Sequence, residues 1–161
     1  MNNEIKTKIL ILSDTHGDFE IINIIKDYEN PNWIIHCGDH GLSENELDSL
    51  GIIYVCGNND WIGELEKFFS IENFNFALTH SHIIDYKQDL VKGLYNRYQE
   101  KNIDFILYGH THIQSIQKIN NVYLLNPGSL AYPRNKNKQK TYIILNVYQN
   151  NEFDILIKYL N

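Results

Sequence analysis

The chain has 161 residues, 43% of them hydrophobic, and a formal net charge of −6 with its seven histidines neutral. This length is typical of one domain, expected here over residues 1–161, and the composition excludes a collagen-like or disordered chain. No stretch approaches the ~20 apolar residues of a membrane helix, and the acidic balance argues against a broad nucleic-acid-binding surface. The N-terminus shows no export signal, so we expect a cytoplasmic protein with both cysteines reduced.

The first part of the chain alternates apolar runs with segments of helical periodicity. Strands are predicted at 8–12, 33–37 and 52–56, and helices at 19–28 and 43–50. Ser43, with Glu46 three residues later, has the spacing of a capping box at the start of the second helix. A hairpin is predicted from 65–71 and 74–79, followed by a helix at 89–101 and a buried strand at 105–108. The remaining strands, expected to be antiparallel, are predicted at 113–119, 122–125, 141–148 and 152–159. The chain is therefore α/β with a β-rich second half.

Polar loops follow the four buried strands, and a fifth polar loop follows the hairpin. Their sequences are Asp14-Thr15-His16-Gly17, Gly38-Asp39-His40, Gly57-Asn58-Asn59-Asp60, Thr79-His80-Ser81-His82 and Gly109-His110-Thr111-His112. Ligands of open α/β sheets bind beyond the carboxyl ends of the strands, so we expect these loops to converge. All seven histidines lie in or beside these loops, and imidazole with oxygen donors is metal-ligand chemistry. The pattern predicts a metal site.

Not every residue of these loops is interpreted as a ligand. His36 lies inside an apolar strand and is interpreted as a core or supporting histidine. The sequence leaves the roles of His40 and His82 open. Cys37 and Cys56 end strands near the predicted site and are expected to be small buried residues.

The ordered set Asp14-x-His16, Gly38-Asp39, Gly57-Asn58-x-Asp60, His80-x-His82 and Gly109-His110-x-His112 resembles the calcineurin-like metallophosphoesterase superfamily. The short length and the loop Asn126-Pro127-Gly128-Ser129 resemble its small YfcE-related phosphodiesterase branch. The resemblance covers about residues 7–159. It implies a four-layer αββα sandwich, with two mixed β-sheets face to face and helices outside.

The resemblance also implies a two-metal site. One divalent ion would be bound by Asp14, His16, Asp39 and His112, and the other by Asp39, Asn58, His80 and His110, with Asp39 as the bridge. Two such ions neutralise a phosphate ester and activate a hydroxide for in-line attack on phosphorus. Mixed N/O ligands suit Mn, the metal expected here, and also Ni, Co, Fe or Zn.

Two positions depart from the family pattern. Asn59 replaces the His of many phosphatase relatives and the Cys that is usual in the small phosphodiesterase branch. An amide donates a hydrogen bond but not a proton, so weak catalysis is expected with poor leaving groups, with His82 or a bound water as the substitute acid. Asp60 is then a supporting group beside the site. Ser81 replaces a usual Gly, which raises the question of whether His80 is correctly placed.

The predicted function is metal-dependent hydrolysis of a small phosphodiester. Asn59 and Arg134 are the expected substrate contacts, although Arg134 can equally be a solvated loop charge. The alternatives are a phosphomonoesterase, which Asn59 disfavours, and a catalytically weak metal-binding scaffold resembling the retromer subunit of this fold. We expect no membrane partner, and a homodimer is possible.

Overall fold

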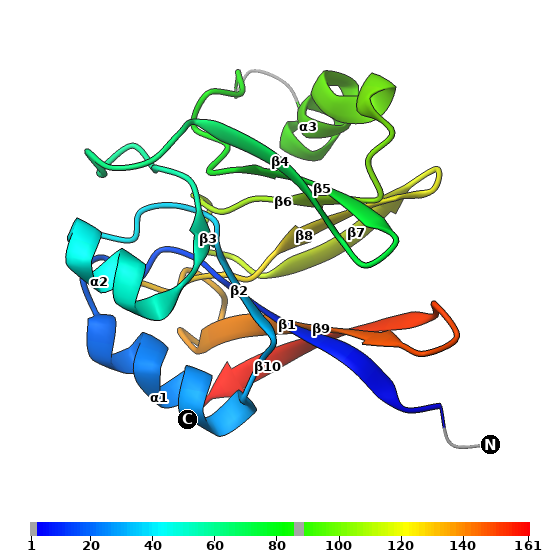
Figure 1. The fold of residues 1–161 in the computed structure, drawn as a ribbon. Coiled ribbons are helices and arrows are strands. Elements are labelled where there is room, and N and C mark those ends of the chain that lie inside the picture. The colour runs from blue at the N-terminus through cyan, green and yellow to red at the C-terminus, as the bar shows by residue number, and fades with distance from the viewer. Residues whose placement is uncertain (1–2, 86–88) are drawn as a thin grey trace.

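The computed structural model describes residues 3–85 and 89–161. Two five-stranded sheets lie face to face, with helices α1 and α2 outside one sheet and α3 outside the other (Figure 1). This is the expected αββα sandwich. No helix in these ranges is long and apolar enough to cross a membrane.

The first sheet has the strand order β10-β9-β1-β2-β3. Its strands are β1 (Ile5–Leu12), β2 (Trp33–His36), β3 (Ile53–Tyr54), β9 (Lys140–Tyr148) and β10 (Phe153–Leu160). β1, β2 and β3 are parallel, whereas β9 runs antiparallel to both β1 and β10. The carboxyl ends of β1, β2 and β3 therefore lie at one edge, as the sequence predicts.

The second sheet has the order β4-β5-β6-β8-β7. Its strands are β4 (Glu66–Ile71), β5 (Phe74–Thr79), β6 (Phe105–Leu107), β7 (Ser115–Ile119) and β8 (Val122–Asn126). The predicted hairpin is confirmed as β4–β5. The antiparallel pairing expected of the later strands is confirmed for β7 with β8 and for β9 with β10, and β8 pairs in addition parallel to β6. The long connection through β7 returns the chain alongside β6, so β5, β6 and β8 share one direction.

Side chains cap the amino ends of all three α-helices. Helix α1 (Phe19–Glu29) is capped by the Asp18 carboxylate, which accepts from the Ile21 N–H, and α2 (Glu44–Leu50) has the predicted Ser43–Glu46 capping box. Helix α3 (Leu90–Tyr98) is capped by Asp89 and continues into a 3₁₀ turn, Gln99–Lys101. These caps satisfy backbone N–H groups that have no partner within the helix.

Strand β1 shows why this sequence forms layers. Ile9 and Ile11 belong to the core between the two sheets, whereas Leu10 and Leu12 pack with the helices α1 and α2. Successive side chains of a strand point to opposite faces, so a strand covered on both faces needs a continuous apolar run. A third core lies between the second sheet and α3.

Candidate metal centre

The five polar loops converge at one end of the two sheets. Backbone hydrogen bonds join the first two, from Asp14 N–H to the Gly38 carbonyl and from His16 N–H to the Asp39 carbonyl. The His110 N–H donates to Oδ2 of Asp14 across 3.2 Å, which connects the two sheets. Two clusters with metal-binding geometry result, and their members are Asp14, His16 and His112, and Asp14, Asp39 and His80.

His80 has its ring orientation fixed by a backbone carbonyl. Its Nδ1 lies 2.9 Å from the Cys37 carbonyl oxygen, which can only accept, so Nδ1 carries the hydrogen. In the neutral ring the lone pair is then on Nε2. That nitrogen lies 3.4 Å from Oδ2 of Asp39 and 3.1 Å from Oδ1 of Asn58. Oxygen atoms of Asp39 and Asn58 thus face the lone pair of His80 Nε2, and a cation bound between them could accept electron density from all three.

His112 repeats this arrangement on the other side of the cluster. Its Nδ1 donates to the carbonyl of Tyr132 across 2.7 Å, and its Nε2 lies 2.9 Å from Oδ1 of Asp14. Within the described ranges, Nε2 of His16 is buried without a hydrogen-bond partner. Metal-binding histidines usually donate their second nitrogen to a carbonyl or carboxylate in this way. The residues present therefore fit a metal centre.

Asp39 lies between the two groups of predicted ligands. Its Oδ2 is 3.8 Å from Nε2 of His16 and 3.4 Å from Nε2 of His80. His110 joins the same side as His80, with its Nδ1 3.2 Å from Nε2 of that ring. The structure thus brings together the seven predicted ligands, which are Asp14, His16, Asp39, Asn58, His80, His110 and His112.

Charges within the cluster shift the pKa values of its members. Burial alone would raise the pKa of Asp14 and of Asp39, but hydrogen bonds and positive charge from His112 and His80 lower both. The pKa of His80 is raised because the two carboxylates outweigh its burial, and that of His112 is raised by its hydrogen bond to Asp14. The carboxylates thus stabilise positive charge at the two nitrogens that face them.

Asn59 and Asp60 form hydrogen bonds within the protein that support the predicted ligands. Asn59 donates its backbone N–H to Oδ1 of Asp39 and its side-chain amide to Oδ2, at 2.9 and 2.8 Å. The Asp60 carboxylate accepts from the N–H groups of Gly57, His40 and Gly41. Asn59 therefore fixes the orientation of the predicted ligand Asp39. Asp60 connects the loop at 57–60 to residues 40 and 41 by hydrogen bonds.

The remaining predicted residues lie at the edge of the cluster. The His82 ring is 5.5 Å from the His80 ring and 6.3 Å from the His110 ring, and Nδ1 of His82 is buried without a hydrogen-bond partner among the described residues. Arg134 is exposed, and its backbone N–H donates to the His112 carbonyl. Both residues therefore lie beside the predicted ligands.

Two histidines left out of the ligand set have structural roles. His36 accepts from the Gly38 N–H at Nδ1 and contacts Oγ1 of Thr15 at Nε2. His40 accepts from the Leu42 N–H and contacts the Ile62 carbonyl, so both of its nitrogens are used. The structural interpretation of His36 fits, and the open question over His40 is answered in the same way. The expectation of two buried cysteines is right for Cys37 only, because Cys56, two residues beyond β3, is only partly buried.

Left-handed backbone conformations are concentrated at the centre. Positive φ angles occur at Asp14, His16, Asp39, Ser81, His110 and His112. Such angles cost non-glycine residues free energy and persist where surrounding contacts enforce them. Ser81, with φ of 81°, adopts the backbone angle that a glycine would favour, and its buried hydroxyl donates to the Gly109 carbonyl. The replacement is compatible with a correctly oriented His80.

Two glycines permit close approach to the carboxylates. A Cβ at Gly57 would lie 2.0 Å from Oδ1 of Asp39, and one at Gly109 would lie 2.1 Å from Oγ of Ser13 and 2.9 Å from Oδ2 of Asp14. Any larger residue would displace the side chains that the cluster needs.

Sequence reasoning did not assign the groups that hold the loops in place. Ser13 and Ser129 donate to the side chain and the backbone carbonyl of Asp14, respectively. Asn126 donates to the Gly109 carbonyl and to Thr111, which fixes the 109–112 loop. Asn126 and Ser129 are fully buried. The 126–129 motif itself was the available signal, because buried polar residues need partners.

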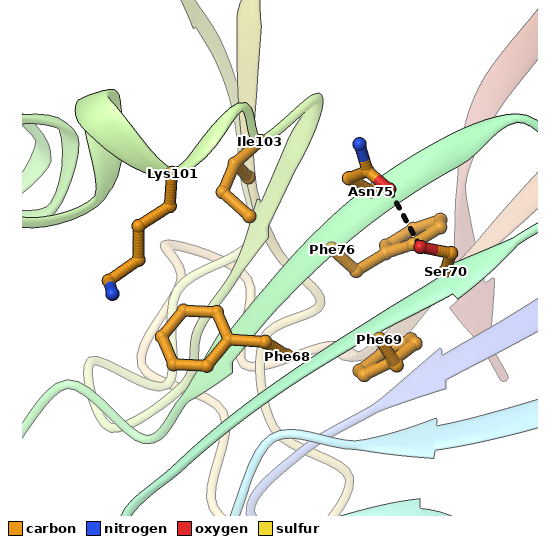
Figure 2. Close-up of a pocket in the computed structure, with 7 residues that line it drawn as sticks. All are labelled: Phe68, Phe69, Ser70, Asn75, Phe76, Lys101 and Ile103. Carbon is orange, nitrogen blue, oxygen red and sulfur yellow. Dashed lines mark hydrogen bonds between the residues drawn. The ribbon is translucent and has the colours of Figure 1, made fainter.

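The metal cluster is distinct from the pocket drawn in Figure 2. That pocket lies on the β4–β5 hairpin and the segment after α3, with the hydrogen bond between Ser70 and Asn75 on one side and Lys101 on the other. None of its lining residues belongs to the five polar loops. It offers no candidate metal ligand.

The fold and the cluster define the class of protein, and comparison with known proteins agrees. The chain belongs to the calcineurin-like phosphoesterase superfamily, whose domain model matches residues 7–150. A probable metallophosphoesterase of Mycoplasma genitalium is 36% identical over 156 residues, covering 94% of each chain. A phosphodiesterase of Methanocaldococcus jannaschii is 32% identical, covering 75% of this chain and 82% of that protein.

Solved structures share the fold. A predicted phosphoesterase from Streptococcus pneumoniae superimposes with a TM-score of 0.80 at 24% identity, covering 96% of this chain and 97% of its own. Vps29 of Entamoeba histolytica, in a complex with zinc, gives a TM-score of 0.72 at 19% identity over 96% of this chain and 99% of its own.

Proposed function

We propose that this protein is a metal-dependent phosphodiesterase that binds two divalent cations. The observation that carries the proposal is the matched pair His80 and His112. Backbone carbonyls hold the Nδ1 of each ring, so that both Nε2 atoms face the carboxylates of Asp39 and Asp14. Burying nitrogen and oxygen lone pairs against one another costs free energy unless a cation lies between them. The arrangement is therefore better explained by metal binding than by fold stability alone.

The donor atoms divide naturally between two ions. One set is Asp14, His16, Asp39 and His112, and the other is Asp39, Asn58, His80 and His110. Oδ2 of Asp39 lies within 4 Å of an imidazole nitrogen in each set, which supports a bridging role. Nitrogen and oxygen donors together suit Mn, which we propose as the native metal, and also Fe, Co, Ni or Zn.

The bound cations would supply charge neutralisation of the phosphate ester and an acidified water. The protein's own residues would position both. Asn59 fixes the plane of the Asp39 carboxylate, and the two carbonyl-bound histidines keep their lone pairs directed inward. We propose that Arg134, which is exposed and whose backbone N–H donates to the His112 carbonyl, contacts a non-reacting phosphate oxygen.

The identity of the residue after Asn58 favours diesters with acidic leaving groups. Asn59 supplies no proton, and its amide is directed to Asp39 instead of outward. His82 lies outside the two ligand sets with its ring 5.5 Å from the His80 ring, and we propose it as the group that lends a proton. A phosphomonoester with an alkoxide leaving group needs such an acid more, which makes a phosphomonoesterase the weaker alternative.

The experiment is hydrolysis of bis-p-nitrophenyl phosphate by chelated protein to which Mn, Co, Ni, Zn or Mg is returned. Asp39→Asn and His80→Ala should abolish the turnover that metal restores. Asp48→Asn, the same chemical change at an exposed position of α2, should leave it intact.

Absence of turnover with every metal, although calorimetry detects bound ions, would contradict the enzymatic proposal. The alternative of a catalytically weak metal-binding scaffold would then be favoured.

A further inference from the structure

Strand β10 forms an unusually long open edge. It is the last strand of the first sheet, and its eight residues exceed those of the other edge strands, β3 with two, β4 with six and β7 with five. Its sequence, FDILIKYL, has no proline, and its pairing with β9 continues without a bulge to Leu160. Monomeric proteins usually shorten, bend or charge such an edge, because it can pair with another strand.

The hydrogen bonding to β9 determines which backbone groups of β10 remain available. The Tyr148 N–H donates to the Glu152 carbonyl at the turn, so residues 154, 156, 158 and 160 direct their backbone groups toward β9. Residues 153, 155, 157 and 159 then direct theirs to the open edge. An added antiparallel strand must therefore form its hydrogen bonds with residues 153, 155, 157 and 159.

We propose that β10 pairs with β10 of a second copy of this chain, antiparallel, about a two-fold axis at Leu156. In this register Phe153 faces Tyr159 of the partner subunit and Ile155 faces Ile157 of the partner subunit, both through the free backbone groups. Asp154 faces Lys158 of the partner subunit, and symmetry repeats this opposite-charge pair on the other side of the axis. The two first sheets become one continuous sheet.

The charges of the strand select this register. Hydrogen bonds from Asn146 and Tyr148 hold the Asp154 carboxylate on the outer face of the sheet. Lys158 lies on the same face and has no acidic partner among the described residues. An axis at Ile155 would place Asp154 opposite Leu156 and leave Lys158 only Glu152 of the turn. An axis at Ile157 would pair neither charge.

An apolar strip beside the edge is consistent with this occupant. Ile24 and Tyr28 of α1 are 53% and 81% exposed, and Leu156 of β10 is 41% exposed. A groove of about 460 Å³ runs between α1 and the end of β10, and Lys158 lines it. Because the axis is perpendicular to the sheet, α1 of each subunit lies on the same face, and pairing would bring these strips together. The proposal is independent of metal binding and catalysis.

Sedimentation equilibrium over a wide dilution series tests the proposal. The wild-type chain should give twice its 19.0 kDa mass and dissociate on dilution. Asp154→Lys and Lys158→Glu should each weaken self-association by about tenfold or more, since like charges then face each other twice. An equimolar mixture of the two variants should form a heterodimer, because each restores the other's opposite charges. A monomeric wild type at every concentration would overturn the proposal.

Disulfide trapping tests the register itself. At the axis the two Leu156 side chains face each other at about 4.5–5.5 Å between Cβ atoms, so Leu156→Cys should cross-link quickly under mild oxidation. Tyr159→Cys is the matched control, exposed on the same strand but about 20 Å from its symmetry mate. Wild type controls for Cys37 and Cys56. A dimer in which Tyr159→Cys cross-links and Leu156→Cys does not would refute this register.

Discussion

Asn59 donates two hydrogen bonds to the Asp39 carboxylate, one to each oxygen, from its backbone N–H and its side-chain amide. The residue after Asn58 is thus committed to holding a predicted metal ligand. This relationship gives Asn59 a positioning role that depends on its amide group.

Replacing Asn59 by Ala should weaken metal binding without removing a ligand. The backbone bond to Oδ1 of Asp39 stays, but Oδ2 loses its donor and the carboxylate gains rotational freedom. Loss of such a supporting contact typically costs about 10- to 100-fold in metal affinity. Calorimetric titration of the chelated protein with Mn or Zn measures the change. Asn73→Ala, which removes a surface amide on the β4–β5 turn, is the control, and equal affinities for both variants would contradict the positioning role.

Replacing Asn59 by His should change the preference among substrates. A histidine introduces a group that can protonate a leaving oxygen, which typically accelerates such reactions by about 10²–10⁴-fold. Alkyl phosphodiesters should benefit by at least about tenfold relative to bis-p-nitrophenyl phosphate, whose leaving group needs no proton. The measurement is the ratio of kcat/KM for the two substrates. An unchanged ratio at equal metal content would show that leaving-group protonation does not limit this protein.

Gly57→Ala should destroy the metal centre through a steric effect. A Cβ at Gly57 would lie 2.0 Å from Oδ1 of Asp39, so either the carboxylate or the loop must move. Gly51→Ala is the matched control, since its Cβ would meet nothing within 4 Å and only its φ of 61° is unfavourable. We expect the control to lose about 1 kcal/mol of unfolding free energy and keep its metal, as measured by urea denaturation and metal analysis. Full metal occupancy in Gly57→Ala would disprove the close-approach argument.

His36 should make the chain sensitive to acid. Burial, and then the neighbouring His40, lowers its pKa from 6.5 to about 3. Below pH 6.5 the unfolded chain binds a proton that the folded chain does not, so stability falls as the pH falls, and the effect ends near pH 3. The slope from this one group approaches about 1.4 kcal/mol per pH unit.

His36→Gln removes that titration while keeping a polar group beside Thr15 and Gly38. Urea denaturation with chelator at pH 7.5 and 5.0 should show a smaller loss of stability in the variant than in wild type. Parallel losses in the two proteins would mean that other groups control the acid response.

Much of the molecule followed from the sequence alone. Apolar runs such as Lys8–Leu12 predict buried strands, because a strand covered on both faces needs continuous apolar residues. Polar loops directly after Leu12, Cys37 and Tyr108 predict one convergent site, since the carboxyl ends of parallel strands lie at the same edge of a sheet. The family pattern supplied the candidate ligands, and the layers of the sandwich agree with it.

The tertiary structure decided the relationships between residues far apart in sequence. Which nitrogen of His80 faces Asp39 depends on the Cys37 carbonyl, and the parallel pairing of β8 with β6 depends on the route of the whole chain. The hydrogen bond from the Asn59 amide to the Asp39 carboxylate is likewise not predictable from the sequence pattern. Local sequence determines periodicity and polarity over a few residues, whereas the partner of a hydrogen bond is set only when the packed core brings separate loops together.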